Sequence, residues 1–345
     1  MTCPTGTGKS EPTITVAIVA YQSGPTLDRC LAGLAAQTFT DFEILLVDNA
    51  STDGAPQRAA AANPAIRLIS PGDNLGFAAG NNLAAREARG RWLALLNPDA
   101  YPRADWLENM VSAADRYPHI HSFTSRQLMA ENPSLLDGLG DVMSGVGVPY
   151  RGGYSRPDPG DLPTGEVFSP CGAAMLIDRS LFLAMGGFDE SFFCYCEDVD
   201  LGYRLRLRNE ATLVVPDAVV LHEGSVSSGG PRSEFAVFHG TRNRLWLLIK
   251  NTPLLLTPIV LPLHFLVVAI IMTRKFGRLQ ARVTIRALLA ALSNLGPVLI
   301  SRRKVQKART ASTWAIASAM TWNLNDVRRA RTVIRKPKAP RSAGA

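Results

Sequence analysis

The residue types best suited to chemistry are concentrated in one stretch, GGFDESFFCYCEDVD, which runs from Gly186 to Asp200. It contains five acids, Asp189, Glu190, Glu197, Asp198 and Asp200. Aromatic and apolar surroundings disfavour a charged carboxylate and raise its pKa, so such acids usually have a partner or serve as general bases or cation ligands. The structural alternative is that Glu197 and Asp198 stabilise the N-terminus of the helix predicted from LGYRLRLR. That alternative does not explain the Gly-Gly-Phe-Asp-Glu turn before them, so both interpretations stay open at this point.

Three further polar residues follow apolar runs of the sequence. Asp48 could accept a hydrogen bond from the imide of a nucleobase. Asp99 could hold a divalent cation together with diphosphate oxygens, because Mg²⁺ typically binds through one or two carboxylates plus substrate phosphates. His222 could be a neutral imidazole ligand of that cation, although a lone histidine at a strand end is more often structural. With Asp198 as the base for an acceptor hydroxyl, these residues suit one chemistry.

Strands and helices alternate from Thr13 to Tyr117. Continuous apolar strands joined by helical crossovers predict an α/β fold, a parallel sheet covered by helices on both faces. Such sheets bind ligands at the carboxyl ends of their strands, and polar segments follow all four predicted strands. The predicted strands cover residues 14–21, 42–48, 66–70 and 92–97, and the predicted helices cover residues 25–37, 55–62, 78–88 and 104–117.

The pattern is less regular after residue 117. Residues 118–165 are rich in Gly and Pro without a clear period, which predicts a long irregular loop that contributes to an acceptor site. Regular structure is expected to resume at Glu166. The expected strands cover residues 173–178, 212–216 and 218–222, and the expected helices cover residues 179–185, 198–208 and 233–250.

The C-terminal part differs from the rest of the chain in charge and hydropathy. Residues 251–345 contain 17 Lys and Arg against one acid, whereas the whole chain has a formal net charge of +8. The uncharged run Pro253–Met272 is long enough to span a bilayer, which takes about 20 residues, and a shorter apolar stretch covers residues 287–300. Basic clusters flank both stretches. We therefore expect residues 251–335 to form helices associated with a membrane interface, with a buried helical hairpin of a soluble domain as the alternative.

The chain ends, the cysteines and the C-terminal bases argue against a phosphate-binding loop, disulfide bonds and a nucleic acid partner. TGTGKS at residues 5–10 is similar to a phosphate-binding loop but lacks its first glycine and a preceding strand, so residues 1–12 are predicted to be a flexible N-terminus. Residues 336–345 are predicted to be a disordered tail. The five cysteines show no CxxC spacing, which fits reduced thiols in a cytosolic compartment. The C-terminal bases interleave with aliphatic rather than aromatic residues, which argues against a nucleic acid partner.

Between residues 13 and 250 the chain resembles the family 2 glycosyltransferases, which are inverting enzymes with a GT-A fold. The resemblance rests on the order of seven segments: VAIVAYQS, ILLVDNASTDG, NLGFAAGNN, WLALLNPDA, SPCGAAMLI, GGFDESFFCYCEDVDLGYRLR and VVLHEGS. It points to the rhamnosyltransferase-like branch of bacterial cell-surface polysaccharide assembly. It implies a Rossmann-like, mainly parallel sheet with a site for a nucleoside diphosphate sugar.

The resemblance also implies roles for individual residues. Asp198 matches the catalytic base, with Glu197 beside it. Asp99 matches the last acid of the family's DxD metal motif, and His222 matches a metal ligand found in some relatives, so the implied cofactor is Mg²⁺ or Mn²⁺. The first acid of that motif is Asn97 in this chain, which leaves one anionic ligand instead of two and would weaken metal binding. The residues implied to contact the substrates are Tyr21, Asp48, Asn74, Asn82, Asn97, Cys171, Gly172, Ala173 and Asp189.

The reaction implied by the resemblance is a single displacement at the anomeric carbon of a nucleotide sugar such as dTDP-rhamnose. The acceptor would be a hydroxyl of a lipid-linked or polysaccharide glycan, at the cytoplasmic face of a bacterial membrane to which the protein binds peripherally or monotopically. A nucleotidyltransferase stays open as an alternative, although such enzymes usually have a Gly- and Lys-rich loop where this chain has AYQSGPTLDRC. An inactive, membrane-anchored glycan-binding protein is the second alternative, suggested by Asn97.

Overall fold

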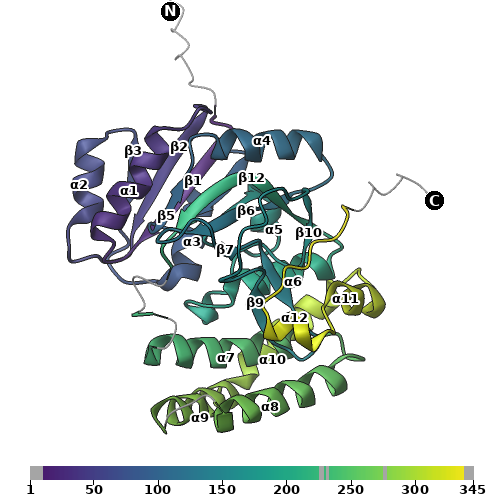
Figure 1. Cartoon of the computed structure of the whole chain (residues 1–345). Helices are drawn as coiled ribbons and strands as arrows, with labels where there is room; N and C mark the ends of the chain where they lie inside the picture. The colour runs from purple at the N-terminus through teal and green to yellow at the C-terminus, as the bar shows by residue number, and fades with distance from the viewer. Residues whose placement is uncertain (1–10, 225–228, 231–232, 275–277, 338–345) are drawn as a thin grey trace, which may run out of the picture.

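A ten-stranded sheet forms the centre of the molecule, with helices on both of its faces and a layer of C-terminal helices beneath it (Figure 1). The computed structural model describes residues 11–224, 229–230, 233–274 and 278–337. Most of the predicted flexible N-terminus, and the predicted disordered tail from residue 338 onward, lie outside the described residues.

The first half of the sheet is parallel, as the sequence predicts. β1 (Ile14–Ala20) pairs in parallel with β2 (Phe42–Asp48) and β4 (Trp92–Leu96), and β2 pairs in parallel with β3 (Ile66–Ile69). Every residue of β4 is buried, because helices cover both faces and leave no solvent-facing side. The helices of this half are α1 (Gly24–Ala35), α2 (Ala55–Ala62), α3 (Gly76–Glu87) and α4 (Trp106–Arg116).

Two apolar cores lie on opposite faces of this sheet. On one face, α1, α2 and α4 pack against Ile14, Val16 and Ile18 of β1. On the other face, α3 packs against Ala17 of β1, together with α5 (Arg179–Ala184) and α6 (Glu197–Leu207). The alternation of β1 side chains between the two cores fixes the register of the central strand.

The second half of the sheet is mixed. β11 (Ala174–Asp178) runs antiparallel to β4 and to β6 (Ser122–Met129), whereas β12 (Thr212–His222) runs parallel to β6. The prediction of a long irregular loop over residues 118–165 was wrong, because β6 is an eight-residue strand inside the sheet.

The sequence of β6, SFTSRQLM, hides this strand because it lacks the apolar run of a core strand. Four of its buried residues are polar, and the three hydroxyl groups and the amide oxygen of Gln127 have partners on neighbouring segments. Thr212 Oγ1 donates to Ser122 Oγ at 3.0 Å, and Trp106 Nε1 donates to Ser125 Oγ at 2.8 Å. Hydrogen bonding to other elements thus replaces apolar packing as the signature of this strand.

Five short strands complete this half of the sheet and a separate hairpin. β5 pairs with β12, β7 pairs with β6, and β8 and β9 form the hairpin. The short strands are β5 (Ala100–Pro102), β7 (Leu136–Gly138), β8 (Asp141–Met143), β9 (Pro149–Arg151) and β10 (Gly165–Val167).

β12 is one bent strand, where the sequence predicts two. Its pairing with β6 shifts register between Val215 and Val219, so the two predicted halves are joined by a bulge. Pro216 lies inside this irregular segment, where its missing N–H breaks no ladder hydrogen bond. The bulge carries the chain on to His222 at the carboxyl end of the sheet.

The C-terminal helices share a core with the sheet domain. α7 (Glu234–Asn251), α8 (Thr257–Arg274) and α9 (Arg278–Ser293) lie beneath the sheet in Figure 1. The core under α6 contains residues of α7, α8, α9, α10 (Leu295–Lys307) and α11 (Thr313–Ala319). The predicted boundary at residue 250 falls at the end of α7, and residues on both sides of it pack together.

The end of the chain returns to the sheet domain. After α12 (Leu324–Arg328) it forms a β-bridge between Arg335 and Glu166 of β10, and Thr321 bridges to Ser144 after β8. Each bridge joins residues more than 160 positions apart, so this segment fastens the C-terminal helices to the second half of the sheet.

The described C-terminal helices do not include one straight membrane span. No single helix within the described residues is long and apolar enough to cross a bilayer. The run predicted from Pro253 becomes helical only at Thr257 and contains Pro262. By length and composition, a bent pair formed by residues 279–293 and 295–307, at 64° to each other, meets the requirement.

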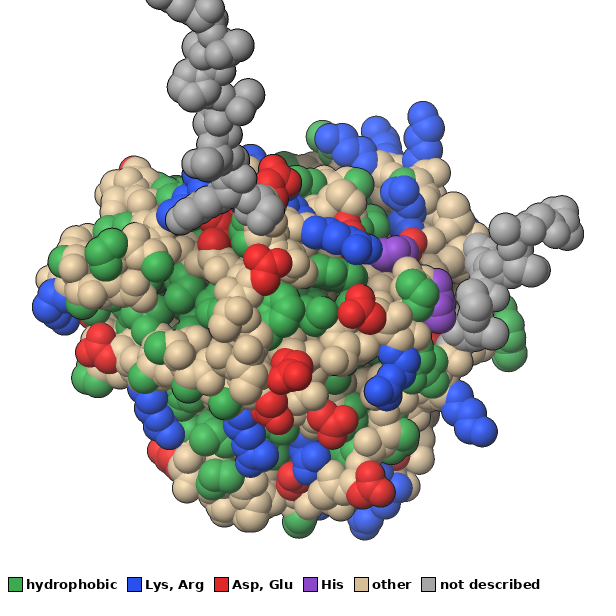
Figure 2. Space-filling model, turned by 90° about the horizontal axis from the view of Figure 1, so that it is seen from above, with side chains coloured by type: hydrophobic (Ala, Val, Ile, Leu, Met, Phe, Trp, Pro, Cys, Tyr) green, Lys and Arg blue, Asp and Glu red, His purple; other side chains and the backbone are tan. Residues whose placement is uncertain are grey.

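The face opposite the C-terminal helices has a mixed surface. Seen from above, at the amino ends of the strands, acidic and basic side chains are interspersed with apolar ones (Figure 2). The carboxyl ends of the parallel strands point away from this face, toward α7 (Figure 1).

Candidate active site

Asp99 and His222 meet at the carboxyl end of the sheet. Asp99 lies in the turn between β4 and β5, and His222 is the last residue of β12. β5 pairs antiparallel with β12 so that Ala100 lies opposite His222. The pairing brings Nε2 of His222 to 3.4 Å from Oδ1 of Asp99, and both side chains are buried.

Asp137 completes a charged chain behind this pair. Its Oδ2 is 2.7 Å from Nδ1 of His222 and 2.6 Å from Nη1 of Arg151, which belongs to β9. Burial would lower the pKa of His222, but its hydrogen bond with Asp137 and its ionic contacts with Asp137 and Asp99 raise it to about 9. Burial would raise the pKa of Asp99 and Asp137, but His222 and Arg151 outweigh it and lower both.

The potential ligand atoms around Asp99 and His222 suit a divalent cation. Nε2 of His222 and Oδ1 of Asn97 are buried without a hydrogen-bond partner among the described residues. Together with the Asp99 carboxylate they offer the imidazole and oxygen ligands that such cations take. The Asp137–His222 contact matches the outer carboxylate that commonly orients a ligating histidine. A cation would take the place of the proton on Nε2.

Asp198 lies at the N-terminus of α6. Its Oδ2 accepts a hydrogen bond from the backbone N of Gly172 at 2.9 Å, and its Oδ1 accepts one from the backbone N of Val199 at 2.8 Å. Residue 172 is a glycine in close quarters, because a Cβ there would lie 3.3 Å from both Phe77 and Asp198. Burial raises the pKa of Asp198, although the two N–H donors and Arg151 counteract it.

Two further groups lie beside Asp198. One side-chain ligand atom each from Asp141, Cys171 and Asp198 lie within 4.8 Å of one another. Asp141 pairs with Arg151 across the β8–β9 hairpin. Burial and the charge of Asp198 raise the pKa of Asp141, and burial raises the pKa of the Cys171 thiol. Ala173 closes this segment, and its carbonyl oxygen accepts a hydrogen bond from the backbone N of Asn97 at 2.9 Å.

Glu197 is the first residue of α6 and is more deeply buried than Asp198. The residue is 5% exposed, and its Oε2 has no hydrogen-bond partner among the described residues. Burial first, and then the charge of Asp198, raise the pKa of Glu197 well above its ordinary value. Two adjacent acids thus have different environments, and Asp198 is the one that accepts from the backbone of both Gly172 and Val199.

Asp189 and Asp200 belong to an ionic network around the buried Lys250. Lys250 of α7 places its Nζ 2.6 Å from Oδ2 of Asp189 and 2.9 Å from Oδ2 of Asp200. Asp200 also accepts from Nε of Arg204 at 2.7 Å and from Nδ2 of Asn251 at 2.7 Å. These contacts tie α6 to α7. The prediction that Asp189 contacts the substrate stays a prediction, since its described contacts are structural.

The first three strands place the predicted nucleotide-binding residues at their carboxyl ends. Tyr21 is 37% exposed after β1. Asp48 ends β2, where it accepts hydrogen bonds from the backbone N of Ser51 at 2.8 Å and from Nε2 of Gln57 at 2.6 Å. Asn74 follows β3, and its Oδ1 accepts from Nδ2 of Asn49 at 2.9 Å. Contact of these residues with a nucleotide stays a prediction.

Asn82 has a different environment from the one expected. Its amide exchanges hydrogen bonds with the backbone of Phe188, accepting at 2.8 Å and donating at 2.9 Å, and also donates to Oε1 of Glu190 at 2.9 Å. Its described contacts therefore hold the acidic stretch against α3, and direct contact with substrate stays a prediction.

Several residues of the site were missed by sequence reasoning. Asp137, Asp141 and Arg151 come from the segment predicted to be an irregular loop, and no local pattern marks them. Asn49 was not singled out although it directly follows Asp48. It is buried, and its Oδ1 accepts a hydrogen bond from the backbone N of Leu75 at 2.9 Å.

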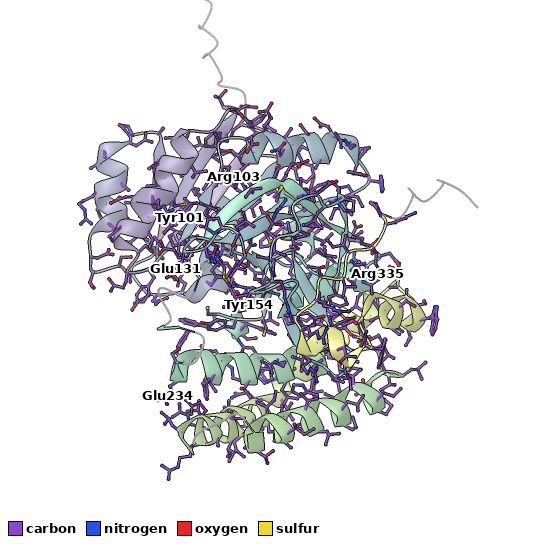
Figure 3. The ribbon with its side chains drawn as sticks, in the orientation of Figure 1. Tyr101, Arg103, Glu131, Tyr154, Glu234 and Arg335 are labelled. Atoms are coloured by element: carbon purple, nitrogen blue, oxygen red, sulfur yellow. The ribbon has the colours of Figure 1, made fainter. Side chains whose placement is uncertain are left out.

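Figure 3 shows where these elements lie in the molecule, with Tyr101 of β5 labelled above and Glu234, at the start of α7, labelled below it.

Comparison with known proteins gives a consistent family. The model of glycosyl transferase family 2 matches residues 15–182. An N-acetylglucosaminyl-diphospho-decaprenol L-rhamnosyltransferase of Mycobacterium tuberculosis is 34% identical over 256 residues, which cover 65% of this chain and 80% of the relative. An O-antigen biosynthesis protein of Myxococcus xanthus is 30% identical over 251 residues, which cover 68% of this chain and 19% of the relative.

Solved structures support the fold. S. aureus TarS 1–349 in complex with UDP-GlcNAc aligns with a TM-score of 0.58 and 17% identity over 92% of both chains. A mannosyltransferase of Pyrobaculum calidifontis in complex with GDP-Man and Mn²⁺ aligns with a TM-score of 0.51 and 19% identity, over 90% of this chain and 86% of that one. At these identities the likeness shows the fold alone, a GT-A-like α/β fold with a central sheet. With the matched family model and the similar rhamnosyltransferase, this means that the chain belongs to glycosyl transferase family 2 and is a glycosyltransferase.

Proposed function

We propose that this enzyme transfers a sugar from a nucleoside diphosphate donor to a glycan hydroxyl with inversion, and that Asp198 is the base. The observation that carries the proposal is the division of the site into two ends. One end holds ionised carboxylates around His222, and the other presents the Asp198 carboxylate on two backbone N–H donors. A single displacement needs both, because negative charge develops on the leaving diphosphate while a proton leaves the attacking hydroxyl.

Asp198 would act on the acceptor. It takes the proton of the acceptor hydroxyl as that oxygen forms a bond to the anomeric carbon, and the bond from that carbon to the diphosphate breaks. Its raised pKa brings it closer to the pH at which a general base works best. The N–H groups of Gly172 and Val199 keep the carboxylate in one orientation during this step. No covalent intermediate is needed, so the buried Cys171 thiol has no role as a nucleophile.

The other end would bind the leaving group. Asp99, His222 and the amide oxygen of Asn97 would hold Mg²⁺ or Mn²⁺, which neutralises the diphosphate when it is bound. Solved structures of the same fold that contain Mn²⁺ with UDP and GalNAc or with GDP-Man support this cofactor class. Asp137 holds His222 in orientation from behind.

The donor sugar and the acceptor are proposed from the similar enzyme. The printed name of the M. tuberculosis relative describes rhamnosyl transfer to N-acetylglucosaminyl-diphospho-decaprenol. We infer a dTDP-rhamnose-like donor and a polyprenyl-linked acceptor for this chain. The competing nucleotidyltransferase and inactive glycan-binding alternatives are not favoured by the family match.

A lipid-linked acceptor would require contact with a membrane surface, and the C-terminal helices are suited to it. Large apolar side chains are exposed on α8, α9 and α10, on helices that also carry Arg282, Arg286 and Arg303. We infer peripheral binding at the cytoplasmic face, where anionic headgroups would attract these bases. The most exposed apolar residues of these helices and the turn before α8 are Leu254, Leu255, Leu266, Leu279, Leu289 and Ile300.

A donor screen tests the function. The full chain is incubated with dTDP-rhamnose, UDP-GlcNAc or GDP-mannose, Mg²⁺ or Mn²⁺, and a polyprenyl-diphosphate N-acetylglucosamine acceptor, and nucleoside diphosphate release is followed. We expect acceptor-dependent release of dTDP and an inverted anomeric configuration in the product by NMR. Release of pyrophosphate, or retention of configuration, would contradict the proposal.

A further inference from the structure

We propose that Phe193, Tyr195, Phe235 and His239 form a binding subsite for a pyranose ring of the acceptor. We refer to these four residues as the aromatic platform. The inference rests on the proposed function, since it assigns the acceptor side of the same site, and it adds a sugar-binding surface to the proton-accepting Asp198.

The four rings lie against one another across two elements. The ring centroids of Phe235 and His239 on α7 are 4.4 Å apart. Phe193, in the loop before α6, lies 6.3 Å from Phe235 and 5.8 Å from His239, and Tyr195 lies 6.1 Å from Phe235. Phe235 is 37% exposed, and the other three are neither fully buried nor fully exposed. The cluster is therefore apolar surface that solvent reaches.

The backbone turns Phe193 away from the core. Its neighbour Phe192 is 1% exposed and packs against Trp246 at 6.3 Å, so that residue anchors the loop. Phe193 has a φ of 64° and a ψ of −62°, with the N–H of Cys194 bonded to the carbonyl oxygen of Phe192. Tyr195 also has a positive φ, of 73°. Residues other than glycine rarely adopt a positive φ, and such backbone strain is concentrated at functional sites.

α7 holds the strained loop in place. Nδ2 of Asn243 donates to the carbonyl oxygens of Phe192, Cys194 and Tyr195 at 2.8–2.9 Å. Asn243 is fully buried, so these bonds are shielded from water. Because three backbone contacts already fix the loop, the exposed aromatic faces are not needed to hold it.

The aromatic platform lies between the donor side and the base. The carbonyl oxygen of Phe193 accepts from the backbone N of Ala78 at 3.1 Å, and a Cβ at Gly76 would lie 2.5 Å from the Phe193 ring. Gly76 begins α3, directly after the segment that contains Asn74. On the other side, Tyr195 is three residues from Asp198 in the chain, so their Cα atoms are at most about 11 Å apart. Two of the four rings thus belong to the short segment that leads directly into the proposed base.

The chemistry of the aromatic platform suits a sugar. Aromatic rings pack their apolar faces against the C–H face of a pyranose and leave its hydroxyls at the edge. Burial, together with the charge of Arg242, lowers the pKa of His239 to about 4, so its imidazole is neutral. Its Nδ1 is 3.1 Å from Nη2 of Arg242, which can only donate. The proton of His239 is therefore on Nε2, which can donate to a sugar hydroxyl.

Two substitutions at one position separate sugar binding from packing. Phe235→Leu keeps an apolar side chain but removes the ring face, whereas Phe235→Tyr keeps the ring. The probe is a soluble N-acetylglucosaminyl-diphospho-citronellol, titrated calorimetrically into the full chain with dTDP and Mg²⁺ present. We expect Phe235→Leu to weaken probe binding about three- to tenfold, the range for an aromatic contact, and Phe235→Tyr to bind as the wild type does.

Two controls define the outcomes. Trp314→Ala, on α11, removes a more exposed aromatic residue outside the aromatic platform and is expected to leave probe binding unchanged. Titration of dTDP alone reports the donor side and should be equal in all variants. Equal probe affinity of the Leu and Tyr variants, or no probe binding by a wild type that binds dTDP, would overturn the subsite. A wild type that binds no nucleotide and releases no nucleoside diphosphate would instead overturn the proposed function.

Discussion

The two ends of the site use the same residue type under opposite electrostatic conditions. At one end, Asp99 and Asp137 are buried, but His222 and Arg151 lower their pKa values. At the other end, burial raises the pKa of Asp198 and, with the charge of Asp198, that of Asp141. We refer to them as the metal end and the base end.

The difference between the two ends lies in the partners rather than in the depth of burial. A carboxylate with a cation beside it stays ionised and can neutralise or coordinate positive charge. A buried carboxylate whose backbone N–H donors do not fully offset the effect of burial has a higher proton affinity and can accept a proton. The proposed division of a displacement reaction between the two ends therefore rests on carboxyl groups whose different partners the sequence does not show.

The largest expected effect is at the base end. Asp198→Asn keeps the shape and the hydrogen bond from Gly172 but cannot accept a proton, so we expect kcat/KM to fall by about a thousandfold, within the range for a general base. Nucleotide-sugar binding, measured by calorimetry, should change little because the metal end is intact.

The matched control for this variant is Asp105→Asn, on the exposed N-terminus of α4 and outside the site. It should retain full activity. Undiminished turnover by the Asp198→Asn enzyme would show that another group accepts the proton.

The next largest effect is at the metal end. Asp99→Asn removes its one proposed anionic ligand, so we expect kcat/KM to fall by about a hundredfold, a few kcal/mol of electrostatic stabilisation. The wild type treated with EDTA should lose activity to a similar extent and regain it with Mg²⁺ or Mn²⁺. Full activity in EDTA would remove the cation from the mechanism.

The pH dependence of kcat/KM tests the raised pKa of the base end. Asp198 must be ionised to act as a base, and burial raises its pKa above the ordinary 3.8. As pH falls through this raised pKa, kcat/KM should fall about tenfold per unit. Arg151 lowers the pKa of Asp198, so Arg151→Gln should move the acidic limb of the profile to higher pH, whereas Arg151→Lys should restore it. An unmoved limb in Arg151→Gln would show that Arg151 does not act on the base.

The metal and base ends also differ in how much of them the sequence could predict. Asp99, Asp198 and His222 each lie at or next to an end of a regular element, so strand and helix patterns place them at one edge of the sheet. Such patterns do not place their partners Asp137 and Arg151. They lie in three-residue strands beyond β6, a core strand in which most of the buried residues are polar, and Asp137 contacts His222 across 85 positions.

The fold shows the same limit. β1 to β4 were predicted because parallel strands covered on both faces are continuously apolar. β6 was missed because hydrogen bonds replace apolar contacts along it, as at Ser122 and Ser125. Periodicity detects burial by hydrophobic contact, so it detects neither a polar core strand nor the long-range ion pairs that such a strand positions.

A smaller effect tests the asymmetry of the metal end. Asn97→Asp would give this end a second carboxylate beside Asp99, in place of an amide oxygen that is buried without a partner among the described residues. We expect the Mg²⁺ concentration for half-maximal activity to fall by up to about tenfold, with kcat changed less. Asn97→Ala is the matched loss of the amide oxygen and should raise that concentration. Equal metal dependence in all three proteins would place the cation away from residue 97.

The smallest expected effect separates the two adjacent acids of the base end. Burial and the charge of Asp198 raise the pKa of Glu197, so we expect it to be protonated when Asp198 is ionised. Glu197→Gln replaces that neutral acid by a group of the same shape, and kcat/KM should change by less than about threefold, as expected for a near-isosteric neutral pair. A loss as large as that of Asp198→Asn would mean that Glu197 functions ionised, and the contrast between the two ends would then not extend to this residue.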